Sequence, residues 1–139
     1  MMNKISIEVK PNIKTYDIDI AGHVNNIVYL KWFEALRTKL FDKYFNLAEL
    51  LSKNIYPVVI STEIRYKNYL KLFDEPVAVM CIESFNHGII TVQAEISLNG
   101  KIAALGKQSC VLLNLDESAI IKSNRFSEVT KHIQKVSDI

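Results

Sequence analysis

Cysteine, glycine and proline are scarce in this sequence, and each scarcity excludes a class of protein. The 139 residues include 2 Cys, 4 Gly and 3 Pro. So little glycine and proline excludes a collagen-like chain and a low-complexity, disordered one. Cys81 and Cys110 lie in separate apolar runs without close Cys or His neighbours. We therefore expect two buried free thiols and no structural zinc site.

A strong charge of one sign and a long apolar run are also missing. Counting 17 Lys and Arg against 15 Asp and Glu gives a net charge of +2, too weak a field to favour a nucleic-acid-binding protein. No apolar run approaches the roughly 20 residues that cross a bilayer, and the first residues alternate instead of forming a signal peptide. We expect no nucleic-acid partner, no membrane span and a cytoplasmic protein.

Nothing in the sequence divides the chain into parts. It contains no internal repeat and no Pro/Ser-rich linker, and its charges are scattered. A hydrophobic share of 49% and a charged share of 23% are typical of a globular protein whose length suits one core. Residues 1–139 are predicted to form a single domain.

One long segment is unusually apolar at helical spacing. Residues 25–41 contain no Gly or Pro, and Asn25 is a good candidate for the N-cap. The polar stripe is narrow, formed by Lys31, Glu34 and Thr38. We expect a helix buried over most of its circumference, with Glu34 and Arg37 forming a local ion pair.

Period-2 alternation marks the predicted strands. Residues 5–9 alternate before Pro11, and a variable stretch, 46–54, follows the helix. Four more strand-like segments come next, at about 60–67, 77–85, 90–98 and 102–115. Residues 86–88 predict a turn, and Asn99-Gly100 predicts a type I′ hairpin turn.

Near the end of the chain, apolar residues return at helical spacing. Phe126, Val129, Ile133 and Val136 recur at intervals of three and four, which predicts a short amphipathic helix on the outside of the sheet. The order of one strand, one very apolar helix and four antiparallel strands predicts an α+β fold whose sheet wraps the helix. A small sheet leaves its edges unpaired, which favours a dimer that joins them.

The densest polar cluster in an apolar context comes directly before the long helix. It reads YDIDIAGHVNNIVY and covers residues 16–29. A helix N-terminus offers unpaired N–H groups and a partial positive charge, which suit an oxygen that gains negative charge in a reaction. A loop can fold the Asp19 carboxylate back towards Asn26 at the start of the helix.

This segment, continued by FEALR at residues 33–37, resembles the 4-hydroxybenzoyl-CoA thioesterase-like family of hotdog-fold acyl-CoA thioesterases. The resemblance implies a hotdog fold, an antiparallel sheet wrapped around one long apolar helix. It also implies hydrolysis of an acyl thioester to a free carboxylic acid and a thiol, without a cofactor. Asp19 matches the catalytic carboxylate, as nucleophile or general base, and Asn26 matches the residue whose backbone N–H polarises the thioester carbonyl. Sites between subunits imply a homodimer or a homotetramer.

The neighbouring candidates each have a structural alternative. His23 joins the catalytic candidates because histidine titrates near neutral pH, although orienting the loop is favoured over proton transfer. Asp17 and Asn25 are candidate substrate contacts, with holding the loop and capping the helix as the alternatives. Tyr29, one turn inside the helix, is expected to form a wall of the substrate pocket.

Basic residues in and after one predicted strand are candidates for binding coenzyme A. Arg65 and Lys67 carry the charge and donors that phosphates require, and the alternative is a solvated face. Metal ligation is not expected, because Asp17, Asp19 and His23 form no recognised zinc set.

Other functions stay open from the sequence. An acyl-carrier-protein thioester is as acceptable a substrate as acyl-CoA. A non-catalytic acyl-CoA-binding module is a further alternative, which Asp19 and the lack of an attached DNA-binding segment disfavour. A hotdog-fold hydratase is disfavoured, because the Asp-x-Asn-Pro-x-His pattern of such enzymes is missing.

Overall fold

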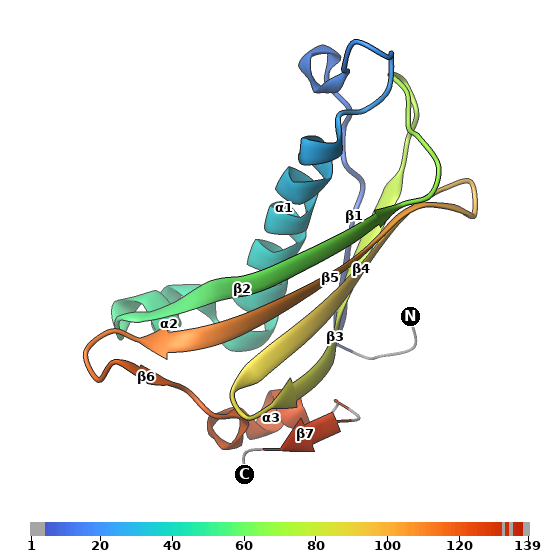
Figure 1. The fold of residues 1–139 in the computed structure, drawn as a ribbon. Helices are drawn as coiled ribbons and strands as arrows, with labels where there is room; N and C mark the ends of the chain where they lie inside the picture. The colour runs from blue at the N-terminus through green and yellow to red at the C-terminus, as the bar shows by residue number, and fades with distance from the viewer. Residues whose placement is uncertain (1–4, 132, 134, 138–139) are drawn as a thin grey trace.

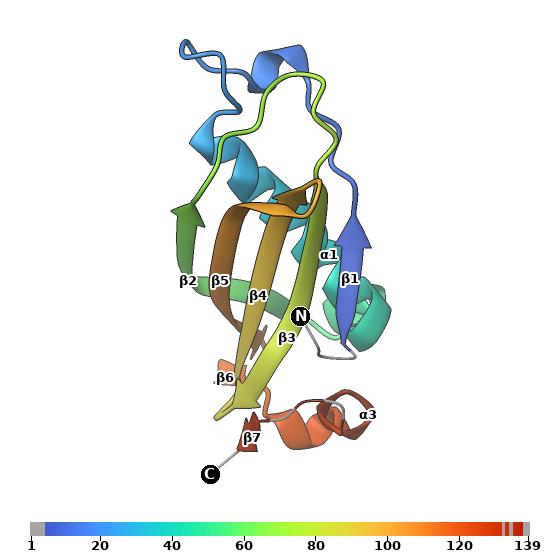
Figure 2. The same cartoon turned by 90° about the vertical axis from the view of Figure 1, so that its right-hand side faces the viewer.

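The computed structural model describes residues 5–131, 133 and 135–137, which form a curved sheet with one long helix against it (Figures 1 and 2). The strands are β1 (Ser6–Val9), β2 (Ile55–Tyr66), β3 (Val77–Asn86), β4 (Ile89–Leu98), β5 (Lys101–Asn114), β6 (Ala119–Ile120) and β7 (Lys135–Ser137). The α-helices are α1 (Asn26–Phe45), α2 (Leu47–Ser52) and α3 (Ser127–Thr130), and two short 3-10 helices are η1 (Thr15–Asp17) and η2 (Ser123–Arg125).

The sheet has the order β1-β3-β4-β5-β2, and all four pairings along this path are antiparallel. Tight turns join β3 to β4 and β4 to β5. Their residues have positive φ, with His87 at 54° and Gly88 at 79° in the first turn and Asn99 at 51° and Gly100 at 79° in the second. Two consecutive positive φ values match the twist of a hairpin, so the predicted Asn99-Gly100 turn is confirmed.

Helix α1 packs its apolar side against the concave face of the sheet. Phe33, Leu36 and Leu40 are completely buried there. The packing is tight at Gly106 of β5, where an added Cβ atom would lie 2.1 Å from Cε2 of Phe33. This contact requires glycine, because a methyl group there would overlap the ring.

The other side of α1 is open in the single chain. Ile27 and Leu30 are 60% and 43% exposed, and Glu34 and Ala35 are exposed beside them. The expectation of a helix buried over most of its circumference is therefore wrong for one chain. A single curved sheet covers one side of a helix, and the apolar residues on the far side have no cover within the described chain.

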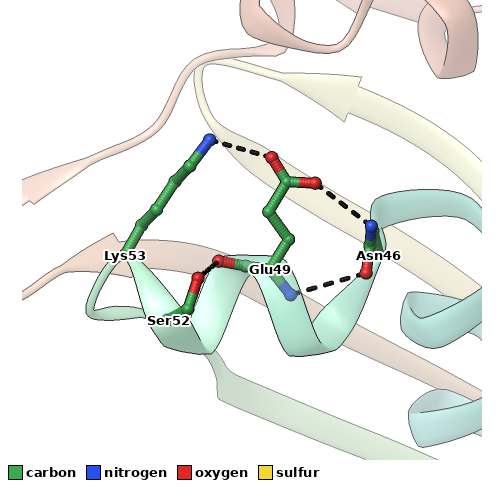
Figure 3. Close-up of polar contacts among 4 residues, drawn as sticks. All are labelled: Asn46, Glu49, Ser52 and Lys53. Atoms are coloured by element: carbon green, nitrogen blue, oxygen red, sulfur yellow. Dashed lines mark hydrogen bonds and ion pairs between the residues drawn. The ribbon is translucent and has the colours of Figure 1, made fainter.

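A second helix occupies the stretch that the sequence left unassigned. Asn46, with a φ of 53°, ends α1 and caps α2. Its side chain accepts a hydrogen bond from the Glu49 N–H and donates one to the Glu49 carboxylate, which also pairs with Lys53 at 2.9 Å (Figure 3). The first of these bonds satisfies one backbone N–H group that the start of a helix otherwise leaves unpaired, and the second holds the capping side chain in place.

The C-terminal segment corrects a second expectation. The predicted amphipathic helix is limited to the single turn of α3, and Val136 lies in β7, which pairs with β3 in parallel. Phe126, Val129 and Ile133 pack onto the hydrophobic core instead of the outside of the sheet. The Phe126 ring lies 5.1 Å from that of Phe45 at the end of α1. The structure of this segment depends on pairing with a strand that is distant in sequence. The helical spacing of its apolar residues does not reveal that pairing.

Strand β2 forms one edge of the sheet, and several of its large hydrophobic side chains are exposed. Its register with β5 shifts between Val59 and Ser61, so Ile60 lies at a bulge. Tyr56, Val58, Ile60 and Tyr66 are all exposed large hydrophobic residues of this strand. Among the described residues, β2 pairs with β5 alone.

The predicted α+β class is confirmed, and the long helix against a curved antiparallel sheet is the hotdog arrangement. Both cysteines are free and buried as expected. The loop before α1 lies at the upper end of the sheet in Figure 1, and α3 lies at the opposite end.

Candidate functional site

The loop before α1 folds into a small hairpin. Ile18 and Val24 form an antiparallel bridge, and the Asp19 N–H donates to the His23 carbonyl at 2.8 Å. Gly22, with a φ of 83°, donates to the Asp19 carbonyl at 3.0 Å and closes the turn. The hairpin therefore reverses the chain directly before the helix begins.

Asp19 is anchored through one carboxylate oxygen. Its Oδ1 accepts hydrogen bonds from the N–H groups of Ala21 at 2.9 Å and His23 at 3.2 Å. The other oxygen, Oδ2, has no hydrogen-bond partner among the described residues, and the side chain is half-buried. Asp19 thus presents one oriented and one available oxygen.

Asp17 is held differently. It is 6% exposed, and its carboxylate accepts a hydrogen bond from the Lys14 N–H at 2.8 Å. Its backbone carbonyl accepts one from the Asn25 N–H at 2.8 Å. This geometry favours the alternative in which Asp17 holds the loop and the helix start over direct contact with a substrate.

The first turn of α1 begins with an N–H group that has no hydrogen-bond partner in the described part of the chain. Asn25 Oδ1 caps the Ile27 N–H at 3.2 Å, and the Asn25 carbonyl accepts from the Val28 N–H at 2.9 Å. No described residue accepts a hydrogen bond from the N–H of Asn26, which is an exposed residue. The Asn26 carbonyl accepts one from the Tyr66 hydroxyl at 3.0 Å. Asn26 therefore keeps its N–H available while its carbonyl is tied to β2.

Aromatic rings surround this helix start. The His23 ring stacks on Tyr69 with centroids 3.7 Å apart and 9° between the planes. Tyr29 is buried and meets Tyr66 edge to face at 5.2 Å and Trp32 at 5.1 Å. Burial, with a smaller contribution from Tyr66, raises the pKa of Tyr29 to about 12. The stacking agrees with an orienting role for His23, whose ring makes no hydrogen bond within the described chain.

The structure turns one of the basic candidates, Arg65, away from this loop. Tyr66 turns towards α1, so Arg65 projects to the opposite face of β2. There its Nε lies 3.7 Å from a Glu63 carboxylate oxygen, beside a hollow of about 310 Å³ that Glu95 and Lys107 also line. Lys67 is exposed just beyond β2, and its N–H donates to the Ala103 carbonyl at 2.8 Å.

A buried glutamine under α1 escaped the sequence analysis. Gln108 of β5 is 4% exposed, accepts from Arg37 Nη1 at 2.9 Å and donates to Thr62 Oγ1 at 3.1 Å. Arg37 also pairs with Glu34, which confirms the predicted ion pair. The alternation of residues 104–112 places Gln108 on the side of β5 that faces the helix, among small and apolar residues. A single polar residue in that series is the sequence signal for a buried glutamine.

Metal and membrane features are limited in the part of the chain that the structure describes. No group of three His, Cys, Asp or Glu side chains is arranged to hold a metal ion in residues 5–131, 133 and 135–137. Within those same ranges, no helix combines the length and the apolar character needed to cross a bilayer.

Comparisons with known proteins identify the family and match the fold. A family model described as the thioesterase-like superfamily matches residues 13–136, while no curated protein matches the sequence. A predicted thioesterase from Bacillus stearothermophilus is similar in structure, with a TM-score of 0.78, 24% identity and coverage of 94% of this chain and 98% of that one. A Thermus thermophilus thioesterase solved with coenzyme A and Zn has a TM-score of 0.75 and 24% identity, over 92% and 93% of the two chains. For a Staphylococcus aureus DHNA-CoA thioesterase these values are 0.75 and 19%, over 89% and 83%.

Proposed function

Because the chain belongs to the thioesterase-like superfamily, we propose that it hydrolyses acyl-CoA to a free carboxylic acid and coenzyme A. Thioester hydrolysis is the activity of its class. Two groups carry the proposal. One is a carboxylate on the small hairpin, and the other is the backbone N–H at the start of the helix that follows it. Among residues that the structure describes, none bonds the second carboxylate oxygen of Asp19 or accepts from the Asn26 N–H. A nucleophilic or basic oxygen and an oxyanion donor are the two groups that acyl transfer requires.

The bonds made by the loop support these two roles. Two backbone N–H groups fix Oδ1 of Asp19, and this also orients Oδ2. The carboxylate therefore loses little conformational entropy when the reaction takes place. The Asn26 N–H lies at the positive end of the α1 dipole, which favours negative charge on a bound oxygen. Removing one oxyanion donor typically raises a barrier by about 2.7–4 kcal/mol, so the backbone of Asn26 supplies a large part of the rate.

For the chemical step, direct attack by Asp19 is the preferred route. An aspartate carboxylate is a weak base at neutral pH, so Asp19 adds to the thioester carbon and the Asn26 N–H holds the oxyanion. The C–S bond then breaks, the thiolate leaves, and a mixed anhydride remains on Asp19. Water attacks the Asp19 carboxyl carbon, which releases the acid and restores the carboxylate. Activation of water by Asp19 as general base is the second route.

Single turnover in ¹⁸O water tests the anhydride route in which water attacks the Asp19 carboxyl carbon. In that route, solvent oxygen is incorporated into Asp19 and none enters the product acid. Mass spectrometry of the peptide that contains Asp19 and of the acid measures both. Label in the acid alone, and never on the protein, contradicts attack at the Asp19 carboxyl carbon, because water that attacks the acyl carbon of the thioester or of an anhydride labels the acid instead.

The substrate proposal is tested by thiol release from a panel of acyl-CoA thioesters of increasing chain length, with an acyl-carrier-protein thioester beside it. Asp19→Asn is expected to lower kcat by about 10³ or more while leaving the fold intact, because the amide is neither nucleophilic nor basic. Asp17→Asn is the matched control and retains kcat within a few-fold.

Several outcomes contradict parts of this proposal. Full activity in Asp19→Asn overturns the role of that carboxylate, and a larger loss in Asp17→Asn than in Asp19→Asn shows that the other aspartate is catalytic. Tight binding of acyl-CoA without hydrolysis supports a non-catalytic binding module. Selective hydrolysis of the carrier-protein thioester shows that the substrate is an acyl carrier protein thioester and not acyl-CoA.

We propose that the chain forms at least a homodimer through β2. Tyr56, Val58 and Ile60 are exposed on this strand, whose outer edge has no partner among the described residues. Pairing with a second β2 satisfies the edge and covers these side chains. A tetramer is a pairing of such dimers.

Light scattering tests this assembly. Ile60→Lys is expected to shift the protein towards monomer, whereas Leu51→Lys, on the exposed surface of α2, leaves the assembly unchanged. A stable, active wild-type monomer at micromolar concentration contradicts the proposal.

A further inference from the structure

The hydroxyl of Tyr66 makes one specific bond at the candidate site. It donates to the carbonyl of Asn26 at 3.0 Å, across 40 residues of sequence. Burial raises the pKa of Tyr66, so the hydroxyl keeps its proton and donates throughout the neutral range. The bond joins the end of edge strand β2 to the first residue of α1.

This bond lies next to the N–H that the proposed reaction uses. The first residue of a helix has no preceding turn to hold it, and terminal turns fray most easily. The Asn26 carbonyl and its N–H flank the same Cα, so fixing the carbonyl restricts the rotation that would turn the N–H away. Other bonds at this end reach Asn25 and Val24, through Asp17 and Leu70, and Tyr66 reaches Asn26 itself.

The Tyr66 ring is fixed independently of its hydroxyl. It packs edge to face on Tyr29, with 5.2 Å between centroids and 79° between the planes. Tyr29 is 2% exposed, so the Tyr66 ring packs against a buried side chain whose motion is restricted. A phenylalanine at position 66 keeps this ring contact and removes only the hydroxyl.

We propose that Tyr66 is a positioning residue, whose hydroxyl holds the start of α1 so that the Asn26 N–H points at the oxygen of the bound thioester. The proposal rests on the proposed function, because it assigns a direction to the same oxyanion donor. Tyr66 acts through Asn26 and exchanges no proton with the substrate.

The test compares Tyr66→Phe with Tyr44→Phe in the acyl-CoA hydrolysis assay. Each variant removes a hydroxyl that donates to a backbone carbonyl, and Tyr44 lies at the other end of α1, where it bonds the Ser6 carbonyl at 3.2 Å. Tyr66→Phe is expected to lower kcat about tenfold, which is less than the roughly 10²–10³ caused by loss of an oxyanion donor, because the Asn26 N–H is misdirected and not removed. KM stays close to wild type and the variant remains folded, whereas Tyr44→Phe changes neither kcat nor KM.

Two unreactive analogues separate positioning from a general loss of binding. A ketone analogue of acyl-CoA, with CH₂ in place of sulfur, keeps the carbonyl that the Asn26 N–H binds, whereas a thioether analogue lacks it. Tyr66→Phe is expected to weaken the ketone complex severalfold and leave the thioether complex unchanged. The infrared C=O stretch of the bound ketone should lie closer to its value in water in the variant, because the carbonyl is less polarised.

Failure of this inference is distinguishable from failure of the proposed function. Wild-type kcat in Tyr66→Phe, or equal weakening of both analogue complexes, overturns the positioning role even if Asp19→Asn is inactive. Full activity in Asp19→Asn overturns the catalytic assignment of Asp19 and leaves the analogue experiment as a separate measure of Tyr66.

Discussion

The two ends of α1 are held by different kinds of interaction. At the C-terminal end, Phe45 lies among Phe41, Phe85 and Phe126, and Asn46 leads directly into α2. At the N-terminal end, the Asp17 and Leu70 carbonyls accept hydrogen bonds from backbone N–H groups just before the helix. The Tyr66 hydroxyl donates a further bond to the carbonyl of the first helical residue, Asn26. The first end is stabilised by buried area, and the second is oriented by a few directional bonds. The proposed reaction uses the second end, where the Asn26 N–H has no hydrogen-bond partner among the described residues.

The largest expected effect is on stability at the C-terminal end. Phe45→Ala removes a buried ring from the four-phenylalanine cluster and is expected to lower the free energy of unfolding by about 3–5 kcal/mol. Below the unfolding transition, kcat per folded molecule should stay within about twofold of wild type. Urea unfolding and assays of the same samples measure both. A large loss of kcat without a loss of stability would erase the distinction between the two ends.

Alkaline pH is expected to act on the N-terminal end. Burial raises the pKa of Tyr29 from 10.0 to about 12, so the unfolded chain releases this proton at lower pH than the folded chain. The stabilisation is fully present below pH 10 and is lost as the pH rises from 10 to 12, by up to about 2 kcal/mol. Tyr29→Phe should flatten the stability profile over this window.

Cys110 supplies the control for that profile. Burial raises its pKa from 9.0 to about 11, although the Arg37 charge acts in the opposite direction. Its share of the stability is therefore lost between pH 9 and 11. Cys110→Ala should flatten only that lower window, and a wild-type slope in both variants would contradict these assignments.

The smallest expected effects come from the two capping asparagines. Asn25→Ala removes the cap of the Ile27 N–H and should cost about 1 kcal/mol of stability. Because the cap lies beside Asn26, kcat should fall as well. Asn46→Gly removes the cap of α2 but tolerates the φ of 53°, so it should lower stability without changing kcat. Equal losses of kcat would show that the helix responds as one rigid body.

Much of the fold was predictable because its signals are local. The alternation of residues 90–98 and the Asn99-Gly100 pair are each defined within one strand or one turn. The short α2 was missed, although Asn46 followed by Glu49 three residues later is a capping signal. The placement of Val136 in β7 depends on β3, about fifty residues away in the chain, and no local pattern contains that information.

The candidate site divides in the same way. The motif identified Asp19, Asn25 and Asn26 because they are neighbours in sequence, and the cap of Asn25 is confirmed. Gln108 and Tyr66 reach α1 from other strands, so their roles depend on the register of β5 and β2. Arg65 was grouped with the site by charge alone, and the alternation of β2 turns it to the opposite face.

The two tight turns of the sheet also suggest an order of assembly. The segment β3-β4-β5 is a meander whose strands are joined by two-residue turns, and such hairpins form within microseconds. Strand β2 pairs with β5, although β3 and β4 lie between them in sequence, and Ile55 is opposite Asn114. Closing so long a loop delays this pairing. We expect the meander to form the folding nucleus and Tyr66 to reach Asn26 late, so that catalytic competence is acquired only when the last edge of the sheet closes.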